Sequence, residues 1–374
     1  MTLHIPDYIR SLVPYVPGKP IEETRREYKI KKVVKLASNE NPLGPSPRAV
    51  VAIRKGLKDL HRYPDGSGFG LKTGLSAHEG VFSQNLILGN GSNEIIDLLI
   101  RTFCLVGDAI VTHRAAFIAY QICAQIHGVI SDIAPVDEGL KCDLSAVIEK
   151  VKSNEKAKIV FLANPNNPTG VYIPRRELAD FFKEMSLIRD GSVIVALDDA
   201  YGEYRTSPDC PNPKEFLKVY PNLMILKTFS KVYGLAGLRV GYGIASSEMI
   251  SILDRVRQPF NLNSLALIGA KAALEDQEFV EQSRRLNVTG MSLWENKLVE
   301  MDVPFWKSQG NFVLINAQLG FGLSGFDLYQ KCLTKGVILR PVMNYGLSHA
   351  LRISVGTPAE NERALKVLSG FAKR

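Results

Sequence analysis

The sequence predicts an α/β fold built on a mostly parallel sheet, and two observations carry this prediction. From about Leu36 to Gly243, short apolar runs alternate with amphipathic segments whose apolar residues recur at helical spacing. The apolar runs are continuous, a pattern typical of strands that are buried on both faces. Strands of this kind, separated by helices, predict a sheet with helices packed on both sides.

The expected strands follow one another along the first two thirds of the chain. Each is a short apolar run, and helix-like patterns such as SNEIIDLLIRTF and RRELADFFKEM lie between them. The runs span residues 85–89, 109–113, 158–163, 193–197 and 223–227.

The length of 374 residues predicts about two domains, and the sequence pattern adds an N-terminal arm. Residues 1–35 are charged and interrupted by prolines, which favours an arm with a short helix. Residues 36–262 carry the strand–helix alternation and form the predicted large domain. Residues 263–374 open with a long helical pattern, followed by the strand-like runs NFVLIN, VILR and LRISV, and predict a smaller α+β domain.

Charge and composition argue against several classes of function. The net charge is +8, but lysine and arginine are spread along the chain, whereas a nucleic-acid-binding protein carries a denser basic patch. No uncharged apolar run is long enough to span a bilayer and the N-terminus lacks a secretory pattern, so we expect a cytoplasmic protein. The five cysteines lie far apart without a CxxC pair, which favours free thiols in a reducing compartment.

Polar or glycine-rich clusters follow the apolar runs. GNGSNE follows the first run, AAF the second, NPNNPTG the third, DDAY the fourth and TFSK the fifth. Ligands of open α/β sheets bind beyond the carboxyl ends of the strands. The five clusters therefore predict one composite site.

Taken alone, the first three clusters also have purely structural explanations. In GNGSNE, Ser92 or Asn93 could simply cap the next helix, or the free N–H groups of that helix could bind a phosphate. Phe117 could be a core residue or could stack on a planar ring. NPNNPTG could be a plain loop of turn formers, or Asn167 could point an amide N–H at a ligand oxygen.

A carboxylate at the end of a buried strand, Asp198, needs a cation or a hydrogen-bond donor. A metal held with Asp199 is one option, but no histidine or further acid lies nearby in sequence, so we expect no metal site. The other options are a structural salt bridge and a protonated nitrogen of a ligand. Tyr201, three residues on, could offer its phenol to the same ligand.

The stretch TFSKVYGLAGLRVGYG places Lys231 beside two hydroxyl residues, Thr228 and Ser230, and eight positions before Arg239. The hydroxyls and the guanidinium suit a phosphate dianion. A desolvated lysine near other cations has a lowered pKa and can attack a carbonyl. A phosphate, a planar ring, a ring nitrogen that needs an acid and an aldehyde that needs a lysine together describe pyridoxal phosphate.

The chain resembles the fold-type-I pyridoxal-phosphate aminotransferases over nearly its whole length. The matching blocks, in order, are PYVPGKP, KLASNENPLGPSP, RYPDG, NPNNPTG, DDAY, TFSKxxGLAGLRxGY and LRISVGT. The lysine block is typical of the superfamily, and the two N-terminal blocks narrow the resemblance to the histidinol-phosphate aminotransferase subgroup. The resemblance implies a mostly parallel seven-stranded sheet in the large domain, a smaller α+β C-terminal domain and an N-terminal arm.

The resemblance also implies a role in cofactor binding for each matching residue. Lys231 would bond to the cofactor aldehyde, and Asp198 would pair with the pyridine nitrogen. Asn167 and Tyr201 would hydrogen-bond the phenolic oxygen of the ring, while Phe117 would stack on its face. The residues that would bind the cofactor phosphate are Ser92, Asn93, Thr228, Ser230 and Arg239.

Substrate contacts follow from the same resemblance. Arg352 would bind the anionic end of the substrate, with Arg340 as a helper and Asn39 as a further substrate-binding residue. Asn344 and Tyr345 are placed near the pocket from their position in the sequence alone.

The resemblance implies a homodimer with shared active sites. Tyr63 would reach the cofactor phosphate of the neighbouring subunit, and Tyr15 would close over the neighbour's substrate. The other expected partners are small molecules, namely a phosphorylated amino alcohol and a 2-oxo acid; we expect neither nucleic acid nor membrane.

Two positions depart from the family pattern. Asp199 stands where the family often has glutamate, and we expect little effect. Ala115 and Ala116 precede Phe117 where the family often has proline and threonine. The aromatic ring is retained, while the shape of the loop before it is left open.

The implied reaction is a ping-pong transamination between L-histidinol phosphate and 2-oxoglutarate, which gives imidazole-acetol phosphate and glutamate in histidine biosynthesis. Lys231, once free, would move a proton as general base and general acid. Two alternative enzymes remain open: an aromatic amino-acid aminotransferase of the same subgroup, and a threonine-phosphate decarboxylase, which needs no 2-oxo acid. A cofactor-binding regulatory protein is not expected, because no DNA-binding segment is appended to the arm.

Overall fold

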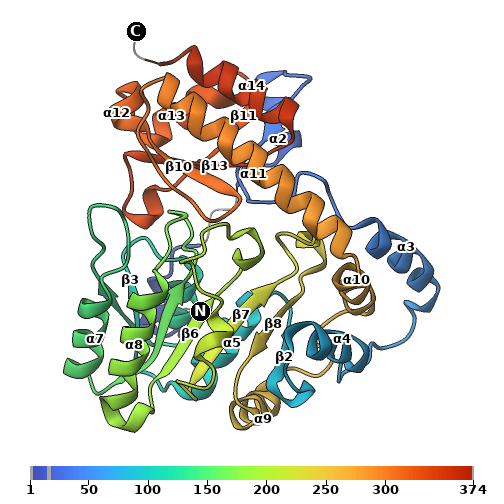
Figure 1. Ribbon diagram of the computed structural model, residues 1–374, viewed down its shortest axis with the longest axis vertical. Helices are drawn as coiled ribbons and strands as arrows, with labels where there is room; N and C mark the ends of the chain where they lie inside the picture. The colour runs from blue at the N-terminus through green and yellow to red at the C-terminus, as the bar shows by residue number, and fades with distance from the viewer. Residues whose placement is uncertain (1–2, 15–17, 373–374) are drawn as a thin grey trace.

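The computed structural model describes residues 3–14 and 18–372. A seven-stranded sheet forms the centre of the larger part of the molecule, and a smaller part with its own sheet lies beside it (Figure 1). Strand β8 is antiparallel to β2 and β7, and the other neighbouring strands are parallel, so the predicted mostly parallel sheet is confirmed. In spatial order the strands are β2 (Leu86–Gly89), β8 (Gly241–Ile244), β7 (Leu223–Thr228), β6 (Ile194–Asp198), β5 (Ala157–Ala163), β3 (Ala109–His113) and β4 (Ile130–Ala134).

The five strands expected from apolar runs are β2, β3, β5, β6 and β7. Two further strands had no such signal. Strand β4 is an edge strand with the mixed sequence ISDIA, and its first residue is exposed. Strand β8, GYGI, is half glycine, and its two glycines fit tightly: a Cβ at Gly241 would lie 2.3 Å from the Ser92 nitrogen, and one at Gly243 would lie 2.7 Å from Met224 Sδ.

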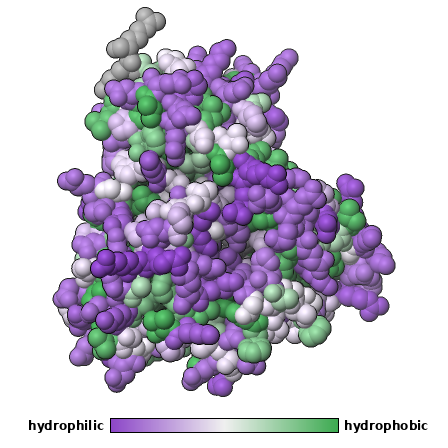
Figure 2. Space-filling model, viewed as in Figure 1, coloured by the Kyte–Doolittle hydropathy of each residue, from purple (hydrophilic) through white to green (hydrophobic). Residues whose placement is uncertain are grey.

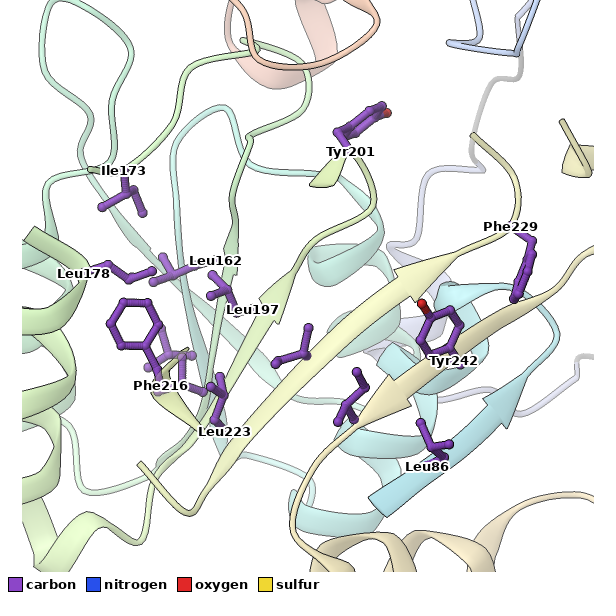
Figure 3. Packing of buried hydrophobic residues seen from close by; sticks show 14 of the residues in the cluster. Leu86, Leu162, Ile173, Leu178, Leu197, Tyr201, Phe216, Leu223, Phe229 and Tyr242 are labelled. Carbon is purple, nitrogen blue, oxygen red and sulfur yellow. The ribbon is translucent and has the colours of Figure 1, made fainter. Parts of the chain in front are cut away.

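Both faces of the large sheet are buried, because successive strand residues point to opposite sides. In β5, Ile159 and Phe161 join one apolar cluster, whereas Val160 and Leu162 join another. In Figure 3, Leu162 and Leu197 from adjacent strands point toward Leu178, while Tyr201 lies beyond the carboxyl end of its strand. The helices packed on the Ile159 side are α5 (Ser92–Phe103), α6 (Ala119–Ile126) and α9 (Ser247–Val256); those on the Val160 side include α4 (Phe69–Glu79), α7 (Leu144–Ser153) and α8 (Arg175–Leu187).

The smaller part is built on a four-stranded antiparallel sheet. Helices pack against it around the fully buried Trp294, whose indole N–H donates to Asn361 Oδ1 at 3.0 Å. The strands, in spatial order, are β12 (Arg340–Pro341), β13 (Ala350–Ser354), β10 (Phe312–Asn316) and β9 (Phe305–Trp306). The helices are α11 (Gln277–Glu300), α12 (Ala317–Phe321), α13 (Gly325–Leu333) and α14 (Pro358–Ser369).

Segments near both predicted domain boundaries pack across them. Strand β1 (Val34–Lys35) pairs in parallel with β11 (Val337–Ile338) of the smaller part. Helix α10 (Ser264–Leu274) packs on α3 (Pro47–Gly56), and its buried alanines belong to the core of the large sheet. The division into residues 1–35, 36–262 and 263–374 stays a prediction.

Within residues 3–14 and 18–35, the N-terminal arm contains two short helices, α1 (Asp7–Arg10) and α2 (Ile21–Tyr28). The face shown in Figure 2 is mostly hydrophilic, with hydrophobic residues scattered over it. Among the helices of residues 3–14 and 18–372, none combines the length and the apolar character that a membrane crossing needs.

Candidate functional site

A cavity of about 240 Å³ lies at the carboxyl ends of the parallel strands, between the large sheet and the smaller part. The composite site predicted from the strand ends is therefore present as a single cavity. It brings together all but two of the site residues expected from the sequence: Asn39, Ser92, Asn93, Phe117, Asn167, Asp198, Tyr201, Thr228, Ser230, Lys231, Arg239, Arg340 and Arg352.

The two exceptions are the residues expected to serve a neighbouring subunit. Tyr63 is 84% exposed, and its ring stacks on Phe260 with the centroids 5.0 Å apart. Tyr15 lies outside the described residues. Of the two positions placed by sequence position alone, Tyr345 lines the cavity, whereas Asn344 lines a separate pocket beside the arm.

Lys231 follows strand β7, where the backbone turns at Thr228. The Thr228 hydroxyl accepts a hydrogen bond from the Ser230 N–H at 3.1 Å, which fixes this turn. The Lys231 ammonium donates to the Ser38 carbonyl at 3.4 Å and lies 5.5 Å from the centroid of the Tyr201 ring. Burial, together with the charge of Arg352, lowers the pKa of Lys231 to about 8. At neutral pH about a tenth of this amine is therefore uncharged and nucleophilic, far more than for an ordinary lysine.

The reactivity of Lys231 is expected to reach half of its maximum near pH 8 and to level off by about pH 9, because its pKa lies near 8 and not near the ordinary lysine value of about 10.4. The check is to label the cofactor-free protein with trinitrobenzenesulfonate across pH 6–11 and to quantify labelled peptides. Lys218, an exposed lysine, serves as the internal control. Lys231 labelling that still rises steeply above about pH 9 would contradict the lowered pKa.

Asp198 ends strand β6 and is buried, with 5% of its surface exposed. One carboxylate oxygen, Oδ2, accepts from the Tyr120 hydroxyl at 2.8 Å, and the other accepts from the Ala200 N–H at 3.1 Å. Burial raises the pKa of Asp198 to about 6, although both hydrogen bonds oppose this rise. The side chain is thus mainly ionised at neutral pH and is available to a cationic group of a ligand.

Tyr201 and Asn167 are held by neighbouring polar side chains. Asn39 Nδ2 donates to the Tyr201 hydroxyl at 2.9 Å, and Arg352 Nη1 donates to Asn167 Oδ1. Burial raises the pKa of Tyr201 to about 12 despite the nearby Arg352 charge, so the phenol keeps its proton. Asn39 is held in turn by the Ser354 hydroxyl, which donates to Asn39 Oδ1 at 2.8 Å.

The corner around the start of helix α5 is suited to an anion. Gly91, with φ +76°, is the N-cap residue and makes no side-chain capping bond, so neither Ser92 nor Asn93 acts as the simple cap. The N–H groups at such a helix start and the helix dipole favour negative charge. Arg239 Nη1 lies 3.5 Å from Ser230 Oγ, and a Cβ at position 91 would approach Arg239 Nη2 to 2.5 Å.

Positive charge dominates the cavity. Four of its lining residues are cationic, whereas Asp198 is the acidic one among the described lining residues: the cations are Lys231, Arg239, Arg340 and Arg352. Arg340 and Arg352 are register partners on strands β12 and β13. Arg352 also donates to the Ala37 carbonyl at 2.8 Å, and its guanidinium carbon lies 5.3 Å from the centre of the Phe312 ring. This balance favours ligands that carry more than one negative charge.

The structure shows how the residues at the two positions that depart from the family pattern, Asp199 and Ala115, are held. Asp199 is buried and pairs with Lys227 at 3.1 Å and with Arg205, and a Cβ at Gly202 would lie 2.4 Å from its carboxylate oxygens. Ala115 has a positive φ of 58°, and its carbonyl accepts from Asn166 Nδ2 at 2.9 Å. The loop before Phe117 is therefore shaped by Asn166 of the NPNNPTG loop.

Sequence reasoning missed several residues that shape the site. Tyr120 donates to Asp198, the Ser38 backbone carbonyl accepts from Lys231, and Ser354 donates to Asn39. Tyr120 was hidden because a tyrosine within an apolar helix pattern is typical of a core residue. Within residues 3–14 and 18–372, no group of three or more His, Cys, Asp or Glu side chains could hold a metal ion.

Comparison with known proteins identifies the family. Residues 31–368 match the family model "aminotransferase class I and II". The chain is 44% identical to histidinol-phosphate aminotransferase 2 of Pseudomonas fluorescens over 98% of this chain and 96% of that protein. It is 42% identical to histidinol-phosphate aminotransferase of Bdellovibrio bacteriovorus over 98% and 97% of the two chains.

A solved structure shares the fold. The crystal structure of histidinol-phosphate aminotransferase from Sinorhizobium meliloti, in complex with pyridoxal-5'-phosphate, matches with a TM-score of 0.89 over 99% of this chain and 98% of that one, at 24% identity. The resemblance inferred from the sequence blocks is confirmed, and the chain belongs to the aminotransferase class I and II family.

Proposed function

We propose that this chain is a pyridoxal-phosphate-dependent transaminase that interconverts L-histidinol phosphate and imidazole-acetol phosphate, with 2-oxoglutarate and glutamate as the second pair. Family membership and relatives named histidinol-phosphate aminotransferase support the reaction class and the substrate. The observation that carries the proposal is the placement of Lys231, with its lowered pKa, in one cationic cavity with the buried Asp198.

The residues that line the cavity fit this cofactor. Lys231 would bond to its aldehyde, Asp198 would pair with its ring nitrogen, and Phe117 would stack on its ring. Tyr201 and Asn167 would hydrogen-bond its phenolic oxygen. The start of helix α5, whose N-cap Gly91 has no side chain to bond the free N–H groups, lies beside the Arg239 guanidinium, and this pairing suits a bound phosphate. The side chains that would hold this phosphate are Ser92, Asn93, Thr228, Ser230 and Arg239.

The bound cofactor supplies an electron sink for the reacting carbon of the substrate. Asp198, ionised and buried, favours a protonated ring nitrogen and so keeps this sink effective. The amine of Lys231, once free, would act as the general base that takes a proton from the reacting carbon of the substrate and as the general acid that gives a proton back. A pKa near 8 suits this work, because the amine can both accept and release a proton at physiological pH.

Arg352 and Arg340 would bind the charged end of the substrate. The substrate presents a phosphate in one half-reaction and a carboxylate in the other, and a guanidinium fork binds both anions through paired N–H groups. The contact of Arg352 with Phe312 and its bond to Ala37 restrict the position of the fork. Asn39 would lie beside the reacting group through its bond to Tyr201.

Replacing Arg352 with lysine is expected to raise KM for histidinol phosphate and for 2-oxoglutarate by about 10- to 100-fold each, with a smaller change in kcat. Lysine keeps the charge but loses the paired donors and the contact with the Phe312 ring. Arg176→Lys, on the exposed side of helix α8, is the matched control. The measurement is steady-state kinetics with each substrate varied in turn; a KM change for only one substrate would contradict a shared anion site.

A substrate panel tests the substrate assignment. The purified protein is assayed with histidinol phosphate, phenylalanine and threonine phosphate, and the products are separated. We expect the highest kcat/KM with histidinol phosphate and a requirement for a 2-oxo acid. A higher kcat/KM with phenylalanine would favour an aromatic amino-acid aminotransferase, and release of carbon dioxide from threonine phosphate without a 2-oxo acid would favour a decarboxylase.

The proposal includes a homodimer in the cytoplasm. Tyr63 would contribute to the partner's cofactor phosphate and Tyr15 to the partner's substrate. The exposure of Tyr63 and the stacked ring of Phe260 beside it support a role away from the subunit's own cavity. The five free cysteines, four of them buried, suit a reducing compartment. Light scattering of the purified protein checks the oligomeric state.

A further inference from the structure

We propose that Tyr120 is a positioning residue that holds both the Asp198 carboxylate and the Phe117 ring where the cofactor needs them. This inference rests on the proposed function and adds to it a residue inside helix α6, outside the cavity lining.

A hydrogen bond joins Tyr120 to the Asp198 carboxylate. Tyr120 is fully buried, and its hydroxyl donates to Asp198 Oδ2 at 2.8 Å. The Ala200 N–H donates to Oδ1 at 3.1 Å. Each carboxylate oxygen thus has its own donor, one from the backbone after β6 and one from α6. The two bonds fix the plane of the carboxylate. The orientation of this plane determines where a protonated ring nitrogen can donate a hydrogen bond to the carboxylate.

The Tyr120 ring contacts two other aromatic rings, those of Phe161 and Phe117. Its ring stacks on Phe161 of strand β5, with centroids 4.9 Å apart and planes 14° apart. Its edge contacts Phe117, with centroids 5.7 Å apart and planes at 88°. Phe117 itself is only partly buried and belongs to the loop that follows β3. Tyr120 therefore connects the ring expected to stack on the cofactor with the carboxylate expected to bind its nitrogen.

The charges around this pair favour a donating hydroxyl. Burial raises the pKa of Tyr120 well above its ordinary value, and the Asp198 charge adds to this, so the phenol stays protonated. Tyr201 and Tyr345 also raise the pKa of Tyr120, whereas Asp199 raises and Lys231 lowers the pKa of Asp198. Burial raises the pKa of Asp198, and the Tyr120 bond lowers it. Loss of this donor would leave more of the carboxyl protonated at neutral pH.

The chain offers a matched control for the substitution. Tyr242 is also buried, and its hydroxyl donates to another buried carboxylate, that of Glu79, at 2.5 Å. Neither Tyr242 nor Glu79 lines the cavity. Tyr242→Phe therefore removes the same atom from the same kind of pair, away from the expected cofactor contacts.

The experiment compares the parent, Tyr120→Phe and Tyr242→Phe, each freed of cofactor and titrated with pyridoxal phosphate between pH 5.5 and 8.5. Protein fluorescence and the visible absorbance band report binding, and thermal unfolding reports stability. For Tyr120→Phe we expect a Kd that is about 10- to 100-fold higher near neutral pH, the loss typical of a hydrogen bond to a charged group. The acid limit of binding should also move to higher pH. Tyr242→Phe should bind like the parent.

Three results would overturn the inference. Binding by Tyr120→Phe equal to that of the parent, or equal losses in both variants, would leave Tyr120 with only a role in the core. A parent protein that does not bind pyridoxal phosphate would overturn the proposed function together with the inference. The parent titration therefore separates a failure of the proposed function from a failure of the inference alone.

A second comparison covers the case in which Tyr120→Phe alone is too unstable to purify. In an Asp198→Asn background the uncharged amide no longer needs a donor for a carboxylate. We then expect the added Tyr120→Phe change to alter Kd by less than about threefold, the scale of a neutral hydrogen bond or less. A further loss of about tenfold or more would contradict action through Asp198.

Discussion

Replacing Lys231 with alanine is expected to lower kcat for transamination by about 10³- to 10⁴-fold or more, because the amine that moves the proton is lost. The same variant should not be destabilised. Burial and the Arg352 charge lower the pKa of Lys231 to about 8, so the unfolded chain binds this proton more tightly than the folded one. At any pH below about 10 the lysine therefore opposes folding, and its removal leaves Tm of the cofactor-free protein unchanged or higher.

Lys227→Ala is the matched control, because Lys227 is a buried lysine four residues before the half-buried Lys231. Its ammonium lies 3.1 Å from Asp199 and 2.9 Å from Glu203. Burial alone would lower its pKa, but Glu203 and Asp199 raise it well above the ordinary value. Removing one partner of such a buried cluster costs about 3–5 kcal/mol of unfolding free energy. Denaturant unfolding and kinetics together should show lost stability for Lys227→Ala and lost catalysis for Lys231→Ala; the reverse pattern would contradict both roles.

Replacing Asp198 with asparagine is expected to lower kcat by about 10²- to 10³-fold or more, the effect of losing a preorganised charge at the reacting group. Asparagine has the shape of aspartate but cannot keep a ring nitrogen protonated. Burial raises the pKa of Asp198 to about 6, above its unfolded value of about 3.9, so its charge opposes folding as the pH rises through this range. The cofactor-free variant should therefore be at least as stable as the parent at pH 8.

Steady-state kinetics and thermal unfolding of Asp198→Asn, with the exposed Asp209→Asn as control, check this prediction. A variant that keeps full kcat would show that the carboxylate serves only the fold. A variant that loses activity and also has a lower Tm would likewise show that the carboxylate serves the fold. We expect a low kcat together with an unchanged or raised Tm. This combination is typical of a residue that serves activity at the expense of stability.

The sequence predicts those parts of the fold in which the local residue pattern agrees with the tertiary packing. Strands β5, β6 and β7 are buried on both faces over most of their length, so apolar residues dominate them, and each is followed by a polar cluster. Because the carboxyl ends of parallel strands meet at one edge, the strand pattern alone predicts that Asn167, Asp198 and Lys231 lie together. Their detailed roles came from the family resemblance.

The remaining parts depend on contacts that leave no local signal. Strand β1 has two residues and pairs with β11 some 300 positions later, as the register partners Val34 and Val337 show. The direction of β8 depends on how the chain returns after Arg239. Tyr120 lies in a sequence pattern typical of the buried face of a helix. Its role in holding the Asp198 carboxylate becomes visible from the 2.8 Å hydrogen bond between them. Such features need the folded chain, because burial and polar pairing are decided by distant residues.

Pyridoxal phosphate bound to this protein is expected to be attached covalently to Lys231. The purified protein is incubated with pyridoxal phosphate, its visible spectrum is recorded, the complex is reduced with borohydride, and the labelled peptide is mapped. We expect a visible absorbance band before reduction and a phosphopyridoxyl group on the peptide that contains Lys231. A protein that stays colourless, or a label carried by another lysine such as Lys227, would contradict this expectation.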